Sequence, residues 1–523
     1  GADPFRRGLG YVDGLSGGVS QPFELTFVPD AVDRLERIDW TRPGVPSQAL
    51  ADYTWRGAMR MNRTVHYGGG NQATGTTTFG YDALGRLTLL EDVVGSPGNP
   101  DVVTNRFEYE YDVANNLKKE KYATASGRAG DRFTYDAYHR LQESYLGVSQ
   151  QLMDQGADPT GYASSHTDKK VGYQLDEAQN REQVRVQQGA LDVTYPYTLE
   201  GPPGFEPSNR YETAHGVVVE HDRRGNLVYD GNYYYRYDYL NRLQEVWRVV
   251  PADQVPAQAQ AGGPAGEAYV PLGQVEALDD SREQVYDEVY NLLHRVPTEH
   301  KDATFRQRLK RSIPGGVVKV IDPATVGSGG SGSGNSVGAG GGGRGGSAGG
   351  SASGGGRGSG GGMPAWILPA DLELVALYGY DPFNRRVLRV VVGEETYVSV
   401  YDGWREVVEH VLNVSALQAE PVKQFVRGSE LDEVLSYRKR TGTSGSYAWE
   451  EYFVQHGGQD TAAKLVDASG AVVERYEYDA YGKATIFSGA SGTTTVGWAA
   501  SRGLPFLWKG VRFDGETGLY YMR

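Results

Sequence analysis

Cysteine is absent from the 523-residue sequence. A chain without thiols forms no disulfide bond, offers no thiolate to a metal ion and has no cysteine nucleophile. The sequence also lacks an apolar run of about 18 residues, the minimum length of a membrane-spanning helix. Its N-terminus lacks the charged and then apolar pattern of a secretion signal. These absences exclude disulfide-stapled folds and cysteine-based catalysis, and they predict no membrane span.

Positive charge is scarce relative to negative charge. Lys and Arg together number 52 against 66 Asp and Glu, which gives a formal net charge of -14. Affinity for nucleic acid depends on clustered Lys and Arg that neutralise phosphates. In the glycine-rich stretch, Arg344 and Arg357 are isolated from other cations, and no glycine run carries the lysine of a phosphate-binding loop. We therefore expect no nucleic-acid partner.

The residue patterns of common catalytic and metal centres are also absent. The nine histidines form no HxH or HExxH spacing, which predicts no metal site and no cofactor. No G-x-S-x-G nucleophile motif occurs. The acidic group Glu430, Asp432 and Glu433 could suggest a glycosidase pair, but acidic clusters at strand ends are more often solvated turns. The sequence therefore favours a solvated turn here, and a protein that is not an enzyme.

The aromatic residues that are present are mostly tyrosines, 36 against 14 phenylalanines. A tyrosine packs its ring against apolar neighbours while its hydroxyl stays in contact with water or a polar group. This composition favours sheets with one face toward water or toward a polar cavity.

The stretch 79–90, FGYDALGRLTLL, has the pattern of a β-hairpin. Tyr81 is a typical strand residue, and Asp82 suits the first position of a type I turn. Gly85 falls three residues later, where a positive φ is needed before Arg86 leads into the second strand. The stretch therefore predicts a strand, a tight turn and a second strand.

The same sequence pattern recurs along the chain. Three residues after each aligned aspartate stand Asp33, Gly85, Asn115, His139, Gln179, Gly225, Asn241, Asn384 and Gly482. All except Gln179 are residue types that tolerate a left-handed backbone. The residues to which we assign a structural turn role are Tyr81, Asp82, Gly85, Arg86, Tyr111, Asp112, Tyr135, Asp136, Asp222, Gly225, Tyr237, Asp238, Tyr380, Asp381, Asn384, Tyr401, Asp402, Tyr478, Asp479 and Gly482.

The motif Y-D-x-x-G-R-L resembles the YD repeat of Rhs proteins, of insecticidal toxin-complex shells and of teneurins. Residues 217–246 look like two consecutive copies, and 398–407, VSVYDGWREV, are similar to the YDGW variant. The run 470–486, followed by 504–523, resembles the beginning of the Rhs-associated core. The number and order of these matches make the resemblance specific.

The sequence divides into five stretches. Residues 1–20 are an N-terminal leader or tag with an extended segment, and 21–250 and 363–523 are the first and second parts of the YD-repeat region. Residues 251–326 are predicted to be an insertion with helices near 281–296 and 302–312. The stretch 327–362 is almost wholly Gly and Ser, a composition typical of a disordered linker.

The resemblance implies an all-β fold, in which a spiralling antiparallel sheet of hairpins forms a YD-repeat shell or a partial barrel. It implies a non-catalytic scaffold that encapsulates or presents a polypeptide cargo, such as a C-terminal toxin, in a secreted or cell-surface bacterial protein. In the family, aspartates beyond the GLYY-type segment release the C-terminal effector by self-cleavage. This chain ends directly after GLYY at 518–521, so the effector lies outside it and no catalytic residue is assigned.

Two alternatives stay open at this point. The first is a surface adhesin in which Trp404, Tyr452 and Trp508 contact a carbohydrate or a surface protein. The second is a hydrolase with carboxylates inside the cavity. A scaffold for cargo predicts an internal cavity, an adhesin predicts a ligand on the outer face, and a hydrolase predicts carboxylates that converge in a cleft.

Overall fold

The computed structural model describes most of the repeat region. The described residues are 7–11, 23–42, 45–67, 73–124, 126–201, 209–249, 269–271, 317–319, 372–413, 418–443, 446–498 and 501–522. The two predicted helices and the glycine-rich stretch 327–362 lie outside the described residues. Inside the predicted insertion 251–326, the described residues are two short paired strands, β22 (Tyr269–Pro271) and β23 (Val317–Lys319). The five predicted boundaries stay predictions.

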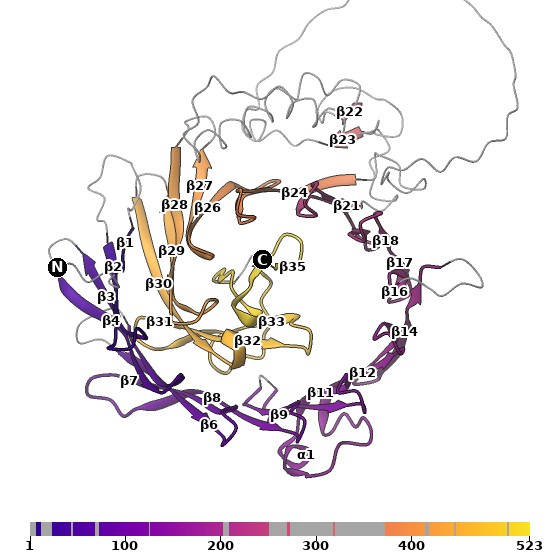
Figure 1. Cartoon of the computed structure of the whole chain (residues 1–523), viewed down its shortest axis with the longest axis horizontal. Helices are drawn as coiled ribbons and strands as arrows, with labels where there is room; N and C mark the ends of the chain where they lie inside the picture. Colours follow the sequence, from indigo (N-terminus) through magenta and orange to yellow (C-terminus); the bar gives the residue numbers. More distant parts are fainter. Residues whose placement is uncertain are drawn as a thin grey trace, which may run out of the picture. The chain divides into compact units, whose positions relative to one another are not determined.

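The fold is nearly all β, and its large sheets are antiparallel, as the sequence predicted (Figure 1). In the first, 14-stranded sheet every strand pairs with the next one in the chain. Its strands are β1 (Arg7–Tyr11), β2 (Phe23–Pro29), β3 (Leu35–Arg42), β4 (Val45–Arg56), β5 (Met59–His66), β6 (Thr74–Tyr81), β7 (Leu87–Gly95), β8 (Val102–Tyr111), β9 (Leu117–Lys121), β10 (Gly130–Tyr135), β11 (Leu141–Val148), β12 (Thr167–Leu175), β13 (Arg181–Gln188) and β14 (Leu191–Pro196).

The later strands follow the same chain-ordered pairing. A small sheet contains β15 (Thr198–Leu199), β16 (Tyr211–Ala214) and β17 (Val217–Val218). Next come β18 (Glu220–His221), β19 (Leu227–Tyr229), β20 (Tyr233–Tyr237), β21 (Leu243–Val249), β24 (Leu372–Tyr380), β25 (Arg386–Val391), β26 (Thr396–Asp402), β27 (Arg405–Asn413), β28 (Gln418–Arg427), β29 (Val434–Thr443), β30 (Ser446–His456), β31 (Ala462–Asp467), β32 (Val472–Tyr478) and β33 (Ala484–Ser488). A last hairpin pairs β34 (Arg512–Asp514) with β35 (Leu519–Tyr521).

Helical structure is confined to short pieces among the described residues. These are α1 (Gln150–Asp154) and the 3₁₀ turns η5 (Gly458–Asp460) and η7 (Trp508–Gly510). No helix in the described part of the chain has the length and apolar character needed to cross a membrane.

The chain forms two compact units, one of Gly1–Glu220 with Ala376–Arg523 and one of His221–Val375. In the second unit the described strands form the hairpin β20–β21 and the parallel contact of Lys319 in β23 with Glu373 in β24. The sites that follow lie in the first unit, apart from the repeat turns of Asp222 and Asp238, which belong to the second.

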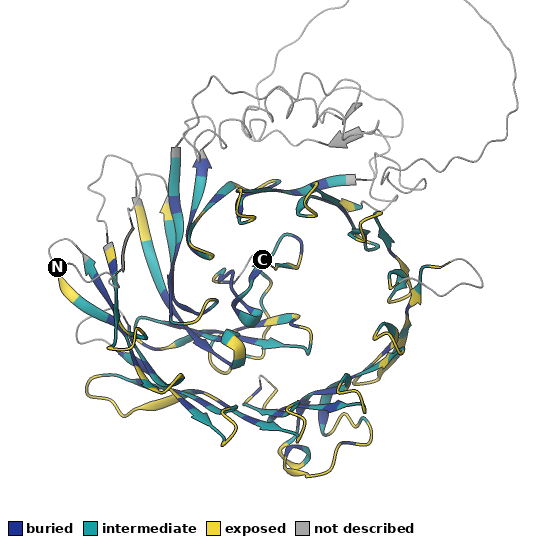
Figure 2. Ribbon diagram, viewed as in Figure 1, coloured by how far each residue is buried: buried dark blue, intermediate teal, exposed yellow. Residues whose placement is uncertain are grey.

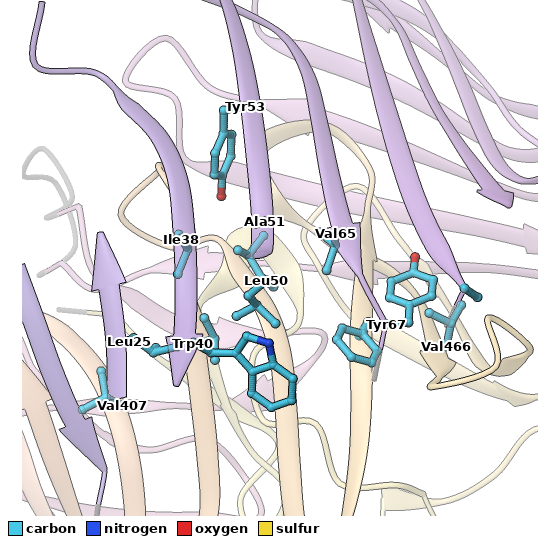
Figure 3. Packing of buried hydrophobic residues seen from close by; sticks show 14 of the residues in the cluster. Leu25, Ile38, Trp40, Leu50, Ala51, Tyr53, Val65, Tyr67, Val407 and Val466 are labelled. Carbon is cyan, nitrogen blue, oxygen red and sulfur yellow. The ribbon is translucent and has the colours of Figure 1, made fainter. Parts of the chain in front are cut away.

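In the first unit, strands from the two halves of the sequence pack face to face. One apolar cluster joins β2–β5 to β27–β31, and the Tyr67 ring lies 4.6 Å from the ring of Phe453 (Figure 3). Its buried members are Leu25, Ile38, Trp40, Leu50, Ala51, Tyr53, Val65, Tyr67, Ala73, Val94, Val407, Val408, Val426, Leu435, Phe453 and Val466.

The opposite face of β28–β33 is covered by the C-terminal segment 504–520. Phe453 belongs to the first cluster, while its neighbour Val454 belongs to a second cluster with Leu504, Phe506 and Leu507. Consecutive residues of a strand point to opposite faces. Both faces of β30 are therefore buried, which explains why Tyr452, Phe453 and Val454 are consecutive apolar or aromatic residues.

Exposed residues gather in the turns between strands, drawn in yellow (Figure 2). Leu84, in the turn after Asp82, is 73% exposed. The repeat motif therefore marks the turns at the ends of the strands, and the strands between the turns supply the packed faces.

Candidate functional site

Each repeat turn is held by its aspartate. Between β6 and β7, the Gly85 N–H donates to the Asp82 carbonyl at 3.0 Å. The Asp82 carboxylate accepts from the N–H groups of Leu84 and Arg86, both at 2.9 Å, and from the Arg86 guanidinium at 2.6 Å. The backbone bond from Arg86 lowers the pKa of Asp82. One carboxylate thus satisfies three donors of its own turn, which accounts for aspartate at this position.

The other repeats use their aspartates in the same way. The N–H groups two and four residues later donate to the side chains of Asp30, Asp112, Asp136, Asp222, Asp238, Asp381 and Asp479. Asp402 differs, because β26 and β27 are joined by the two residues Gly403 and Trp404, and Asp402 pairs in register with Arg405.

The backbone is left-handed at all nine aligned positions, with φ between 62° and 87°. Gln179, the residue that did not fit the sequence pattern, has a φ of 72°. The N–H of Asp176 donates to the Asn180 carbonyl at 2.9 Å, as in the other turns. The turn hydrogen bonds therefore impose this conformation even on a residue with no preference for it, at a cost of about 1 kcal/mol.

The tyrosine hydroxyls connect successive hairpins. Tyr111 donates to the Leu87 carbonyl at 2.9 Å, and Tyr135 donates to the Leu117 carbonyl at the same distance. In both cases the acceptor is the first residue of the strand that leaves the preceding turn. The same type of bond is made by Tyr401 to Arg386 and by Tyr478 to Ala462.

The arginine of the motif makes a second connection between neighbouring turns. The Arg86 guanidinium lies 4.8 Å from the centre of the Tyr111 ring and donates to the Asp112 carbonyl at 3.2 Å. In the same manner Arg140 donates to the Asp176 carbonyl at 2.5 Å. Arg86 with Tyr111, and Arg140, therefore link their turns to the following ones.

The remaining predicted residues also lie in turns. Asp222 and Gly225 lie between β18 and β19, Asp238 between β20 and β21, and Asp381 and Asn384 between β24 and β25, while Tyr237 and Tyr380 are the last residues of β20 and β24. These turns lie one after another at the ends of successive strands and are not gathered into one pocket. Four predicted residues, Tyr111, Tyr135, Tyr478 and Asp479, line the cleft described below.

A buried ion-pair network joins the two halves of the first unit. Glu433 is fully buried and pairs with Arg60 at 2.8 Å and with Arg63. Arg63 donates to Thr77 at 2.8 Å, and Thr77 donates to Asp92. Burial alone would raise the pKa of Glu433, but the two arginines hold it at about 2. The prediction of a solvated turn at 430–433 is therefore wrong for Glu433, because Arg60 and Arg63 of β5 cover it.

A second network holds the C-terminal segment. Arg386 forms a bidentate pair with Asp514, with distances of 2.7 and 2.6 Å. Arg512 pairs with Glu406 at 2.5 Å and with Glu409. All five side chains are buried, and bidentate pairs of this kind fix both position and orientation. The segment that contains β34 is therefore bound tightly to β25 and β27.

Strands β8, β9 and β10 place Tyr109, Glu120 and Asp131 side by side. The register pairs Tyr109 with Glu120 and Glu120 with Asp131, so the three side chains lie in one row on the same face. Asp131 is 4% exposed and accepts from the Tyr122 hydroxyl and from the Gly147 N–H, both at 2.8 Å. Among the described residues, neither Glu120 nor Asp131 has an ion-pair partner.

These two carboxyl groups keep their protons to a higher pH than ordinary side-chain carboxyls. Burial, together with the neighbouring charge of Asp131, raises the pKa of Glu120 to about 8. Burial likewise raises the pKa of Asp131 to about 7, and Glu477 adds to this effect. Like charges placed directly opposite each other on neighbouring strands are unfavourable when both are ionised.

The row faces a cleft of about 460 Å³ whose opposite wall comes from β31, β32, η5 and η7. Glu477 lies on that wall. The aromatic side chains that line the cleft include Phe107, Tyr109, Tyr122, Phe133, Tyr476 and Trp508. A second cavity of about 660 Å³ adjoins it and shares Phe107, Tyr122 and Glu477. We call the first of these spaces the carboxyl cleft.

The sequence did not reveal the carboxyl cleft. Asp131, four residues before Tyr135, falls on the same face of its strand as that tyrosine, so an acidic residue on the packed face was the available signal. The opposite wall comes from residues 457–509, more than 300 positions later, and no pattern in a single sequence indicates which distant strands meet. Among the described residues, no cluster of His, Asp and Glu is arranged to hold a metal ion.

The residues suggested for an adhesin have different surroundings. Tyr452 is 5% exposed and belongs to the second apolar cluster. Trp508 lines the carboxyl cleft. Only Trp404, at 46% exposure, presents a large surface to solvent, so the three residues do not form one binding face.

Replacement of Glu433 by glutamine tests the buried network between the two halves. The Glu433→Gln variant leaves the buried Arg63 guanidinium with only the more distant Asp92, at 4.0 Å, as a countercharge, which costs at most about 3–5 kcal/mol. We expect a clearly lower urea midpoint at neutral pH. The Glu430→Gln variant is the matched control, because Glu430 is exposed, and it should change stability by less than about 0.5 kcal/mol. Equal midpoints for the two variants would contradict the role of the network.

The carboxyl cleft predicts a pH dependence of stability. The pKa values of Glu120 and Asp131 are raised from 4.5 to about 8 and from 3.8 to about 7. Between the unfolded and the folded pKa of each group, the folded chain binds more protons than the unfolded chain. The contribution of the two groups to the free energy of unfolding therefore falls as pH rises. The Glu120→Gln, Asp131→Asn double variant should therefore gain stability relative to the wild type between about pH 5 and about pH 8. Parallel urea midpoints for the two proteins across this range would refute the assignment.

Comparison with known proteins supports the fold. No family model and no curated protein matches the sequence. The chain is similar to the structure of a Photorhabdus luminescens Tc holotoxin pore with a mutation in TccC3, at a TM-score of 0.50 and 13% identity over 98% of this chain and 19% of that one. A TcdB2–TccC3 crystal structure matches at a TM-score of 0.48 and 13% identity, over 99% and 20%. The chain thus spans about a fifth of the length of these structures, and it shares the antiparallel β fold of the Tc holotoxin structure.

Proposed function

We propose that this chain is an Rhs-type YD-repeat scaffold that encloses or presents a polypeptide cargo, such as a C-terminal toxin, in a secreted or cell-surface bacterial protein. The observation that carries the proposal is the linkage of successive hairpins through tyrosine hydroxyls and arginines. This linkage converts a repeated local motif into a continuous wall. A wall of this kind is suited to surrounding a chain, and the fold likeness to the Tc holotoxin structure supports the same interpretation.

The position of the C-terminal segment supports a cargo that continues the chain. Residues 504–520 cover the face of β28–β33 that is turned away from β2–β5. A polypeptide joined after Tyr521 would start on this side of the sheet. The buried ion pairs of Arg386 and Arg512 would anchor it there.

The proposed role is not catalytic. A glycosidase needs one protonated and one ionised carboxyl group at its working pH. Glu120 and Asp131 share the cleft with Glu477, and burial raises the pKa values of the first two, to about 8 and about 7. Below pH 7 Glu120 and Asp131 are mainly protonated, so this pair supplies little of the ionised carboxylate that a glycosidase needs there.

Protection from proteolysis tests the proposal. A short unstructured polypeptide rich in protease sites is fused after Arg523, and the same polypeptide is fused to the N-terminus as the control. An enclosing wall should slow cleavage of the C-terminal fusion at least about tenfold relative to the N-terminal one, because a protease cannot reach a chain inside it. Equal cleavage rates for the two fusions would overturn enclosure of the cargo.

A further inference from the structure

We propose that the carboxyl cleft binds the cationic side chain of a lysine or arginine from an extended polypeptide. The inference deepens the proposed scaffold function and rests on it for the origin of that polypeptide. It specifies which side chains of that polypeptide the carboxyl cleft recognises.

The first argument is the missing countercharge. Buried Glu433 and Asp514 each pair with arginines of this chain. Glu120 and Asp131 lie in a row without such a partner among the described residues. Glu477, across the cleft, lies 3.8 Å from the Arg475 guanidinium, and Lys509 also lines the cleft. A buried carboxyl group without a cation is unfavourable in its ionised form. A guanidinium or ammonium group placed between these carboxyls would stabilise that form.

The second argument is an unsatisfied polar group in the same row. Tyr109 is 6% exposed and lines the cleft, and its hydroxyl lies near the Gly458 backbone and the Glu120 carboxyl but makes no hydrogen bond of normal geometry to either. Buried hydroxyl groups nearly always have a partner. The hydroxyl oxygen can accept an N–H from an incoming cation, next to the Glu120 carboxyl group.

The third argument is the aromatic lining. The ring of Phe107 lies 5.1 Å from the ring of Tyr122, and both line the cleft together with Tyr476. Aromatic faces attract ammonium and guanidinium groups, and the attraction grows when water is excluded. They also pack against the methylene groups that carry these cations. A cleft that combines carboxyls with aromatic faces therefore selects lysine and arginine over neutral apolar side chains.

The space fits a polypeptide better than a free ion. The carboxyl cleft has a volume of about 460 Å³ and adjoins the cavity of about 660 Å³. The larger cavity is lined by Arg128, Lys464 and Arg475, cations that suit backbone carbonyls or acidic side chains. A chain that passes through both spaces would place a basic residue in the carboxyl cleft and polar or acidic groups beside it.

Binding of matched peptides tests the proposal. The probes are an acetylated and amidated tripeptide, Ala-Arg-Ala, and the same peptide with citrulline, which has the shape of arginine without its charge. Their dissociation constants for the full chain are measured at about pH 8 by calorimetry, with the fluorescence of its eight tryptophans, among them Trp508 of the cleft, as a second readout. We expect the arginine peptide to bind at least about tenfold more tightly, as charge-assisted hydrogen bonds allow.

Two double variants separate the cleft from the general negative charge of the protein. Glu120→Gln with Asp131→Asn should abolish the preference for arginine. Asp158→Asn with Asp192→Asn changes the net charge equally at exposed positions and should retain the preference within about twofold. Equal affinity of the wild type for the two peptides, or a preference that survives in the cleft variant, overturns the proposal. Cleavage of either peptide would also overturn it.

The peptide test and the fusion test fail independently. The comparison of arginine with citrulline uses the wild-type protein, so it does not depend on the folding of any variant. A preference for arginine without protection of the C-terminal fusion would preserve the binding site and reject the scaffold function. Protection of the C-terminal fusion without a preference for arginine would preserve the scaffold function and reject the binding site.

Discussion

The hydrogen bond from a tyrosine hydroxyl to a carbonyl of the preceding hairpin is the contact on which the rest of the architecture depends. A single β-hairpin is marginally stable in water. The Tyr111 hydroxyl joins the hairpin of Asp112 to that of Asp82. The Arg86 guanidinium of the Asp82 hairpin joins the same two hairpins by donating to the Asp112 carbonyl. Repetition of this contact links each of these hairpins to the one before it. The large sheets, and the cavities between them, follow from it.

Packing between distant parts of the chain adds a second level of organisation. Strands β2–β5 and the segment 504–520 cover opposite faces of the later strands. Buried ion pairs, above all those of Glu433 and Arg512, hold these layers in register. Removal of either partner leaves an unpaired buried charge, so such pairs specify one arrangement more strongly than they add stability. The carboxyl cleft lies where this packing leaves room.

The local features were predictable from the sequence, and the long-range ones were not. The pattern of Tyr81, Asp82 and Gly85 predicted the hairpin, because turn chemistry acts within five residues. The pairing of Arg63 with Glu433 spans 370 positions, and a solvated acidic turn was the better interpretation without the partner strand. Gln179 shows the converse case, since the turn hydrogen bonds prevail over its own preference. The carboxyl cleft, like the pairing of Glu433, was not predicted because its two walls come from strands that are distant in the sequence.

The most direct measurement is hydrogen–deuterium exchange, read by mass spectrometry, in a Tyr111→Phe variant. This substitution removes only the hydroxyl that donates to the Leu87 carbonyl. If the tyrosine fixes one hairpin to the previous one, exchange should accelerate in peptides that cover 79–90 as well as in those that cover 107–121. Acceleration confined to 107–121, or none at all, would contradict the account.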